Sequence, residues 1–178
     1  MWKRGFLVLM LAAGLAACDD DSPTAPADPN LAIFTAQLSA LNEVGGGTPV
    51  TTNLETTARG DVRIEFRLTR DSGNAVTGAT ATFIVNMTGF PAGSSWILAH
   101  IHRGIAGVAG GVEVNTGLSA ANAIPLVNGG VTGQRFEDRP VDQGDTNEIL
   151  NNPSGFYFNA HTVANPTGAV RGQLVRIQ

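Results

Sequence analysis

Alternation of apolar and polar residues is the feature that most constrains the fold of this chain. It is clearest over residues 61–68, where Val62, Ile64, Phe66 and Leu68 alternate with charged side chains. A period of two is typical of a β-strand with one buried face and one face in water. The pattern therefore predicts a chain built of strands rather than of amphipathic helices.

Similar segments recur along the chain, separated by turns rich in glycine, proline and asparagine. The eight expected strands are residues 33–41, 61–68, 80–87, 97–103, 111–115, 130–136, 156–163 and 168–177. A short helix is expected near 146–151, with Asp145 as its N-cap, Glu148 completing a capping box and Pro153 ending it. These elements predict an all-β fold, either a Greek-key antiparallel sandwich or a flattened barrel.

The N-terminus has the features of a secretion signal. Lys3 and Arg4 precede an apolar run over residues 5–15, too short to span a membrane, and Leu-Ala-Ala-Cys follows at 15–18. This ending resembles a bacterial lipobox, in which the signal is removed and the cysteine is acylated. We expect residues 1–17 to be a signal peptide and Cys18, the only cysteine, to be the lipidation site.

Residues 18–30 are acidic and rich in proline, which predicts an extended tether between the lipid and a single domain over residues 31–178. We therefore expect an exported protein, anchored by its lipid to a membrane of the bacterial cell envelope. The chain has 11 basic and 15 acidic residues, and its only lysine lies in the expected signal. Nucleic acid is excluded as a partner, because phosphate binding requires concentrated lysine and arginine.

The three histidines of the chain lie in two expected strands. His100 and His102 are two residues apart, which places them on one face of their strand together with Trp96 and Leu98. His161 belongs to a later strand. If the two strands pair, the three imidazoles can converge.

Other polar residues accompany the histidines. Tyr157 and Asn159 share a strand face with His161, Glu43 follows the first strand, and Arg171 lies in the last one. Arginine can bind a carboxylate ligand bidentately or pair with an acid inside the fold, and we favour a pair between Arg171 and Glu43.

The same segments resemble the CHRD (chordin) domain, a β-rich extracellular module. The resemblance rests on Glu43 after an N-terminal strand, on residues 99–104 (Ala-His-Ile-His-Arg-Gly), and on residues 155–162 followed by Asn-Pro-Thr-Gly-Ala-Val-Arg-Gly-Gln at 165–173. It covers about residues 32–176 and implies an exported protein with one β-domain and no established enzymatic activity. One departure is the glycine-rich loop after Glu43, where the family usually has a Glu-Val-Pro-Pro type of turn.

Two interpretations of the histidines remain open. They could coordinate zinc or copper, with Glu43 or water completing the sphere. They could instead form a structural network, in which the imidazoles bond to backbone carbonyls, Asn159 and Thr162. The sequence favours the network, because three neutral ligands without a carboxylate are an incomplete metal signature.

The function expected from sequence is a noncatalytic module without a cofactor, which binds a protein or glycan partner through loops at one end of the domain. No Gly-x-Ser-x-Gly elbow or phosphate-binding loop with its lysine occurs in the sequence, and no enzyme is expected. The alternative is a metal-binding or redox protein that uses His100, His102 and His161.

Overall fold

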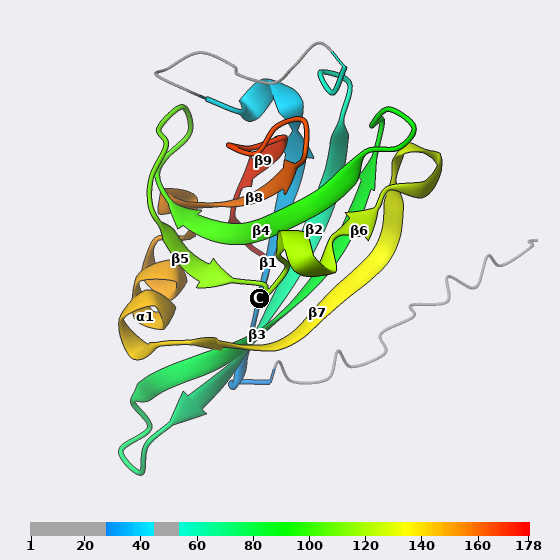
Figure 1. Cartoon of the computed structure of the whole chain (residues 1–178). Helices are drawn as coiled ribbons and strands as arrows, with labels where there is room; N and C mark the ends of the chain where they lie inside the picture. Colours follow the sequence, from blue (N-terminus) through cyan, green and yellow to red (C-terminus); the bar gives the residue numbers. More distant parts are fainter. Residues whose placement is uncertain (1–27, 45–53) are drawn as a thin grey trace, which may run out of the picture.

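The strands of the domain form one antiparallel sheet that rolls almost closed (Figure 1). The computed structural model describes residues 28–44 and 54–178. Its strands are β1 (Leu31–Ser39), β2 (Arg59–Arg70), β3 (Val76–Thr88), β4 (Ser95–Arg103), β5 (Val112–Asn115), β6 (Ile124–Pro125), β7 (Val131–Val141), β8 (Phe156–Thr162), β9 (Val170–Gln173) and β10 (Val175–Arg176). Across the sheet the order is β5-β4-β8-β9-β1-β2-β3-β7, with β6 beside β4 and β10 beside β1.

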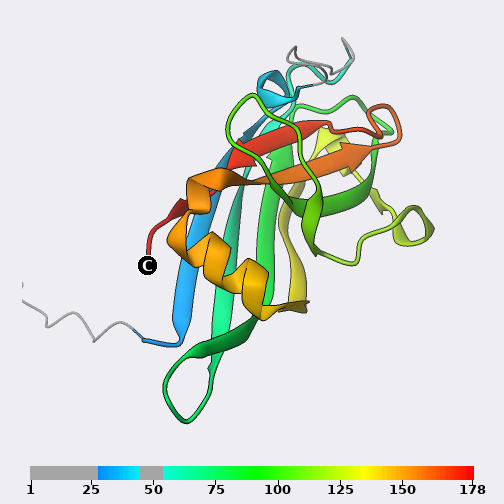
Figure 2. The ribbon, with the colours of Figure 1, turned by 90° about the vertical axis from the view of Figure 1, so that its left-hand side faces the viewer.

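One α-helix, α1 (Gln143–Asn151), packs against β3 and is joined to β8 by a short 3-10 turn (Figure 2). This turn is η4 (Pro153–Gly155), and the other 3-10 turns of the described residues are η1 (Ala40–Asn42), η2 (Ala120–Asn122) and η3 (Val127–Gly129). The expected all-β class with one short helix is confirmed. No helix within the described ranges is long and apolar enough to cross a membrane.

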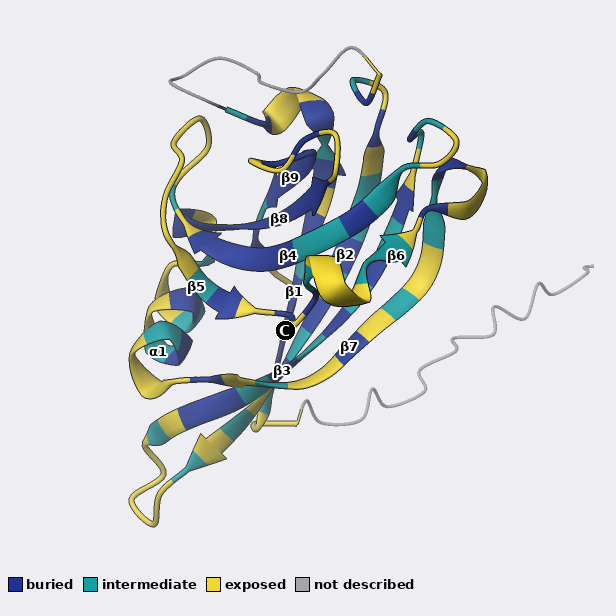
Figure 3. Cartoon of the chain, viewed as in Figure 1, coloured by how far each residue is buried: buried dark blue, intermediate teal, exposed yellow. Residues whose placement is uncertain are grey.

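The core lies inside the rolled sheet, between strands that are far apart in its order. Phe83 of β3 contacts Phe158 of β8, with ring centroids 5.9 Å apart, and Trp96 of β4 meets Phe136 of β7 edge to face at 5.3 Å. These contacts join the two halves of the sheet, and each buried aromatic ring contributes on the order of 2 kcal/mol to stability. Figure 3 shows β8 buried along its length, whereas β7 is mostly exposed or half-buried and buries only Phe136 and Val141.

The helix begins three residues before the position expected from sequence. Its N-cap is Asp142, whose carboxylate accepts a hydrogen bond from the backbone N–H of Asp145 at 2.8 Å. The expected cap at Asp145 and capping box with Glu148 are therefore wrong. Two aspartates three residues apart both fit a cap, and the earlier one is used because β7 continues to Val141, directly before it.

The expected last strand over residues 168–177 is divided into β9 and β10. Leu174 lies between them, is buried, and donates its backbone N–H to the carbonyl of Phe156. The residues expected to be a signal peptide (1–17), the lipidated Cys18 and most of the tether (18–30) lie outside the described residues. Of the tether, residues 28–30 are described, and the side chain of Asn30 accepts a hydrogen bond from Arg70 of β2.

Candidate functional site

Antiparallel pairing of β4 with β8 brings the three histidines together. His100 lies opposite Asn159, and Leu98 lies opposite His161. Side chains directly opposite one another share a face of the sheet, so His100, His102 and His161 project from the face that points away from the core. The other face of the same strands carries the buried aromatic and aliphatic residues.

Trp96 does not share the face of the histidines, which corrects the expectation from strand period. The register of β4 against β8 shifts between Trp96 and Leu98, so that one extra residue of β4 is inserted there. A bulge of this kind reverses the side on which the following residues project. Trp96 therefore enters the core, where it is fully buried, while Leu98 stays on the face of His161.

The imidazoles form a compact cluster that we call the histidine cluster: His100, His102 and His161. One ring nitrogen from each lies within 4.8 Å of the other two, and Nδ1 of His100 is 3.4 Å from Nε2 of His161. All three residues are buried, with 6–9% of their surface exposed. Among the described residues, this is the one group of histidines, cysteines and acids close enough to hold a metal ion.

Two backbone carbonyls orient the cluster. Nδ1 of His102 is 3.0 Å from the carbonyl oxygen of Gly110, and Nδ1 of His161 is 3.1 Å from that of Pro166. Since a carbonyl only accepts, each Nδ1 carries the proton and each Nε2 presents its lone pair. The lone pair on Nε2 of His161 faces His100, but Nε2 of His102 is buried without a hydrogen-bond partner in the described part of the chain.

The surroundings keep the imidazoles neutral. Burial, with a smaller contribution from its two histidine neighbours, lowers the pKa of His100 to about 4. Burial likewise lowers the pKa of His161 to about 4, against an opposing effect of the Pro166 carbonyl. The pKa of His102 is also lowered, mainly by burial and with a contribution from the charge of Arg171. At neutral pH the cluster is therefore three uncharged nitrogen donors.

Arg171 and Tyr157 close one side of the cluster. The ring of Tyr157 is stacked on that of His102, 5.0 Å away and inclined by 8°, and the guanidinium carbon of Arg171 lies 3.4 Å from the centre of the tyrosine ring. Nη2 of Arg171 donates to the carbonyls of Ile105 and Val108, each at 2.8 Å. The loop between β4 and β5 is thereby held over β8 and β9 (Figure 2).

The pair expected between Glu43 and Arg171 does not form: no ion pair within 4.0 Å joins these two described residues. Glu43 instead accepts a long hydrogen bond of 3.4 Å from the amide of Asn159. Burial raises the pKa of Glu43 to about 7, although the charge of Arg171 and the bond from Asn159 act in the opposite direction. Glu43 also lies outside the histidine cluster, so the expectation that it completes a metal sphere is not supported by its position.

The network expected from sequence is present only in part. Carbonyls do hold two of the imidazoles, but the side chain of Asn159 bonds to Glu43 and the hydroxyl of Thr162 bonds to Glu55 at 2.6 Å. A structural network that satisfies every polar group would leave no buried orphan, whereas Nε2 of His102 and Oδ1 of Asn159 have no partner among the described residues.

Sequence reasoning missed Glu55, which is fully buried beside the β8–β9 connection. Its carboxylate accepts hydrogen bonds from the hydroxyls of Thr162 and Ser94 and from the amide of Asn165. It thereby fixes the connection that carries Pro166, the carbonyl partner of His161. Glu55 precedes a polar stretch with no strand period, and nothing local in the sequence marks it as buried.

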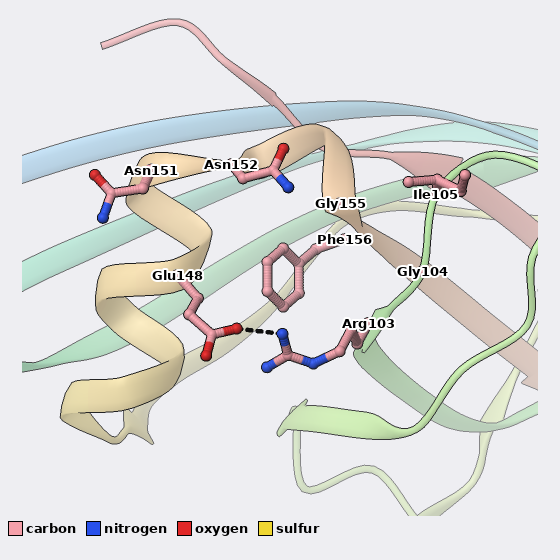
Figure 4. A pocket seen from close by; sticks show the side chains of 8 residues that line it. All are labelled: Arg103, Gly104, Ile105, Glu148, Asn151, Asn152, Gly155 and Phe156. Atoms are coloured by element: carbon pink, nitrogen blue, oxygen red, sulfur yellow. Dashed lines mark hydrogen bonds and ion pairs between the residues drawn. The ribbon is translucent and has the colours of Figure 1, made fainter.

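The larger cavities lie away from the imidazoles. One of about 440 Å³ is lined by Arg103, Glu148 and Phe156 and is drawn in Figure 4. Its charges satisfy one another, since Arg103 pairs with Glu148 and with Glu113 and lies over the ring of Phe156. None of the cavities of about 400–440 Å³ found in the described ranges is lined by a histidine.

Comparison with known proteins gives one match. The model of a family described as the CHRD domain matches residues 34–174, which extend from within β1 to just past β9 and include all three histidines. Neither the curated proteins nor the solved structures contain a match to the chain.

Proposed function

Because the chain belongs to the CHRD domain family, as the match over most of its length shows, we propose that it is an exported, lipid-anchored binding module whose ligand is a single transition-metal ion. The anchor in this proposal is Cys18, and the ion is held by the histidine cluster. In this proposal a metal ion replaces the protein or glycan partner suggested by the sequence, because the most compact group of potential ligands among the described residues is a set of nitrogen donors within 4.8 Å of one another.

The separation of His100 from His161 supports this proposal most strongly. A bond length of 2.0–2.1 Å from zinc to nitrogen corresponds to about 3.4 Å between two ligands of a tetrahedral ion. Nδ1 of His100 and Nε2 of His161 lie 3.4 Å apart. For the widest pair, at most 4.8 Å apart, a contraction of about 0.7 Å per ring would give the same separation.

The hydrogen bonds to the cluster are those that metal-binding histidines use. A ligating histidine commonly donates its other ring N–H to a carbonyl, which fixes the tautomer and the direction of the lone pair. His102 and His161 both have such a partner, in Gly110 and Pro166. A bound ion would also give Nε2 of His102 the partner that the described residues do not supply.

Binding without turnover is the mode of action that we propose. The nitrogens of the three imidazoles lie close to one another, and the cavities of about 400–440 Å³ in the described part of the chain are lined by other residues. The three histidines are themselves buried, with 6–9% of their surface exposed.

The test is the metal content of the full-length protein, purified from membranes in detergent and loaded separately with Zn²⁺, Cu²⁺ and, under reducing anaerobic conditions, Cu⁺. We expect about one ion per chain with at least one of these metals, and a loss of binding in His100→Gln, His102→Gln and His161→Gln. Gln143→Ala, a polar deletion on the remote helix, is the control. Substoichiometric binding of every metal, or equal binding by the histidine variants, would refute the proposal.

A further inference from the structure

We infer that the histidine cluster selects a monovalent ion, copper(I), over divalent ions such as zinc, and that Arg171 enforces this selectivity. The inference rests on the proposed metal-binding function and specifies its ligand. It follows from the donor set, from the fixed positive charge beside it and from the number of ligands.

The donors bring no negative charge to the ion. The cluster consists of three imidazoles, and no carboxylate or thiolate of the described residues belongs to it. Imidazole is a good ligand for both zinc and copper, so donor chemistry alone does not separate them. The charge of the ion separates zinc(II) from copper(I), because a divalent ion in a buried site without an anionic ligand keeps both of its charges uncompensated. The free-energy cost of burying an ion rises with the square of its charge.

Arg171 increases that difference. Its guanidinium is stacked on Tyr157, which is stacked on His102, so the fixed positive charge lies within about 9 Å of the His102 ring. Arg171 is 2% exposed, and its Nη2 bonds to two carbonyls and a side-chain amide oxygen. It forms no ion pair within 4.0 Å with a described acid, although the charge of Glu43 acts on it at longer range. Repulsion from Arg171 is twice as large for a divalent ion as for a monovalent one.

The number of ligands points in the same direction. Structural zinc sites are almost always four-coordinate. The cluster offers three nitrogens, and its His102 side is covered by Tyr157 and by the loop that carries Gly110, which also donates its N–H to the tyrosine hydroxyl. Copper(I) is stable with three nitrogen ligands in one plane, so it needs no fourth group. The ion binds and leaves as copper(I), and no electron transfer is part of the proposal.

The experiment compares affinities in the full-length protein in detergent. Copper(I) is titrated anaerobically against bicinchoninate, and zinc(II) is titrated against a chromophoric chelator at the same pH. We expect tighter binding of copper(I) than of zinc(II) by the wild type. Because a unit charge at about 10 Å and an effective dielectric constant of about 20 changes binding roughly tenfold, Arg171→Gln should narrow the ratio of the two affinities by roughly that factor.

Arg171→Lys is the matched control, because it keeps the charge and loses the planar group, and it should leave the ratio closer to that of the wild type. Near-ultraviolet circular dichroism checks that each variant is folded. If a variant does not fold, the comparison of copper(I) and zinc(II) affinities in the wild type still tests the inference. Tighter binding of zinc(II) by the wild type would overturn the inference and leave the proposed metal site intact. An unchanged ratio in folded Arg171→Gln would overturn the role of Arg171. Failure to bind either metal would refute the proposed function itself.

Discussion

Replacing the buried carboxyl of Glu43 by an amide should stabilise the protein at alkaline pH and leave it almost unchanged in acid. Glu43 is 2% exposed, one of its oxygens has no partner among the described residues, and burial raises its pKa from 4.5 to about 7. A carboxyl whose pKa is higher in the folded than in the unfolded protein favours folding below pH 4.5. This contribution is lost as the pH rises through 7.

The magnitude follows from the two pKa values. Ionising a carboxyl at pH 8 costs the folded protein about 3 kcal/mol when its pKa is about 7 instead of 4.5. Glu43→Gln removes this cost and keeps an acceptor for the amide of Asn159. For a domain of this size, about 3 kcal/mol corresponds to an increase in Tm of about 6–12 °C at pH 8. At pH 5 the same two pKa values leave a cost of about 0.8 kcal/mol, which corresponds to about 2–3 °C.

The assay is thermal unfolding of the full-length protein in detergent at pH 5 and pH 8, followed by the fluorescence of Trp96, which is fully buried in the core. Glu137→Gln, which removes the same charge from an exposed position on β7, is the control and should not show the gain at pH 8. An equal effect of Glu43→Gln at both pH values, or destabilisation at pH 8, would show that the carboxyl is ionised in the folded protein without cost.

Three further predictions concern other parts of the chain. In the Glu43→Gln background, lowering the pH from 7 to 5 should destabilise the metal-free protein by about 2 kcal/mol through His161, because its pKa of about 4 in the folded protein lies below its ordinary value of 6.5. His161→Gln should reduce this dependence of stability on pH, and an unchanged dependence would contradict the prediction. Gly168→Ala should destabilise the folded protein by about 1–3 kcal/mol and weaken metal binding, because φ is +143° and the new Cβ would overlap the carboxyl of Glu43. Gly93→Ala, where φ is also positive but the space is open, should leave metal binding intact. Equal loss of metal binding in both variants would refute this explanation. Cys18→Ala should release the protein from the membrane fraction, and equal incorporation of radiolabelled palmitate into wild type and variant would exclude acylation at this residue.

The fold class was accessible from sequence because the strand signal is local. Alternation over residues 61–68 lies inside β2, and the other expected strands overlap observed ones. Features that depend on how the strands pair could not be predicted from the alternation of residues. The bulge after Trp96 is defined only against β8, and the division of the last strand at Leu174 arises because this residue bonds to Phe156 rather than to β1.

For the candidate site, strand period placed His100 and His102 on one face of their strand, and Tyr157 with His161 on one face of theirs. The register between β4 and β8 then brings these two faces to the same side of the sheet. The partners of the buried charges could not be predicted in the same way. Arg171 was expected to pair with an acid, but it bonds to carbonyls of the β4–β5 loop, whose path over the sheet is a tertiary feature.

The central claim is that the three imidazoles of the histidine cluster bind one metal ion. The most direct measurement is X-ray absorption at the metal edge of the copper(I)-loaded full-length protein. We expect a first shell of three nitrogens at about 2.0 Å, with outer-shell scattering from three imidazole rings that is weakened in His102→Gln. A first shell of sulfur, or of oxygen without imidazole scattering, would contradict the claim and return the cluster to a purely structural role.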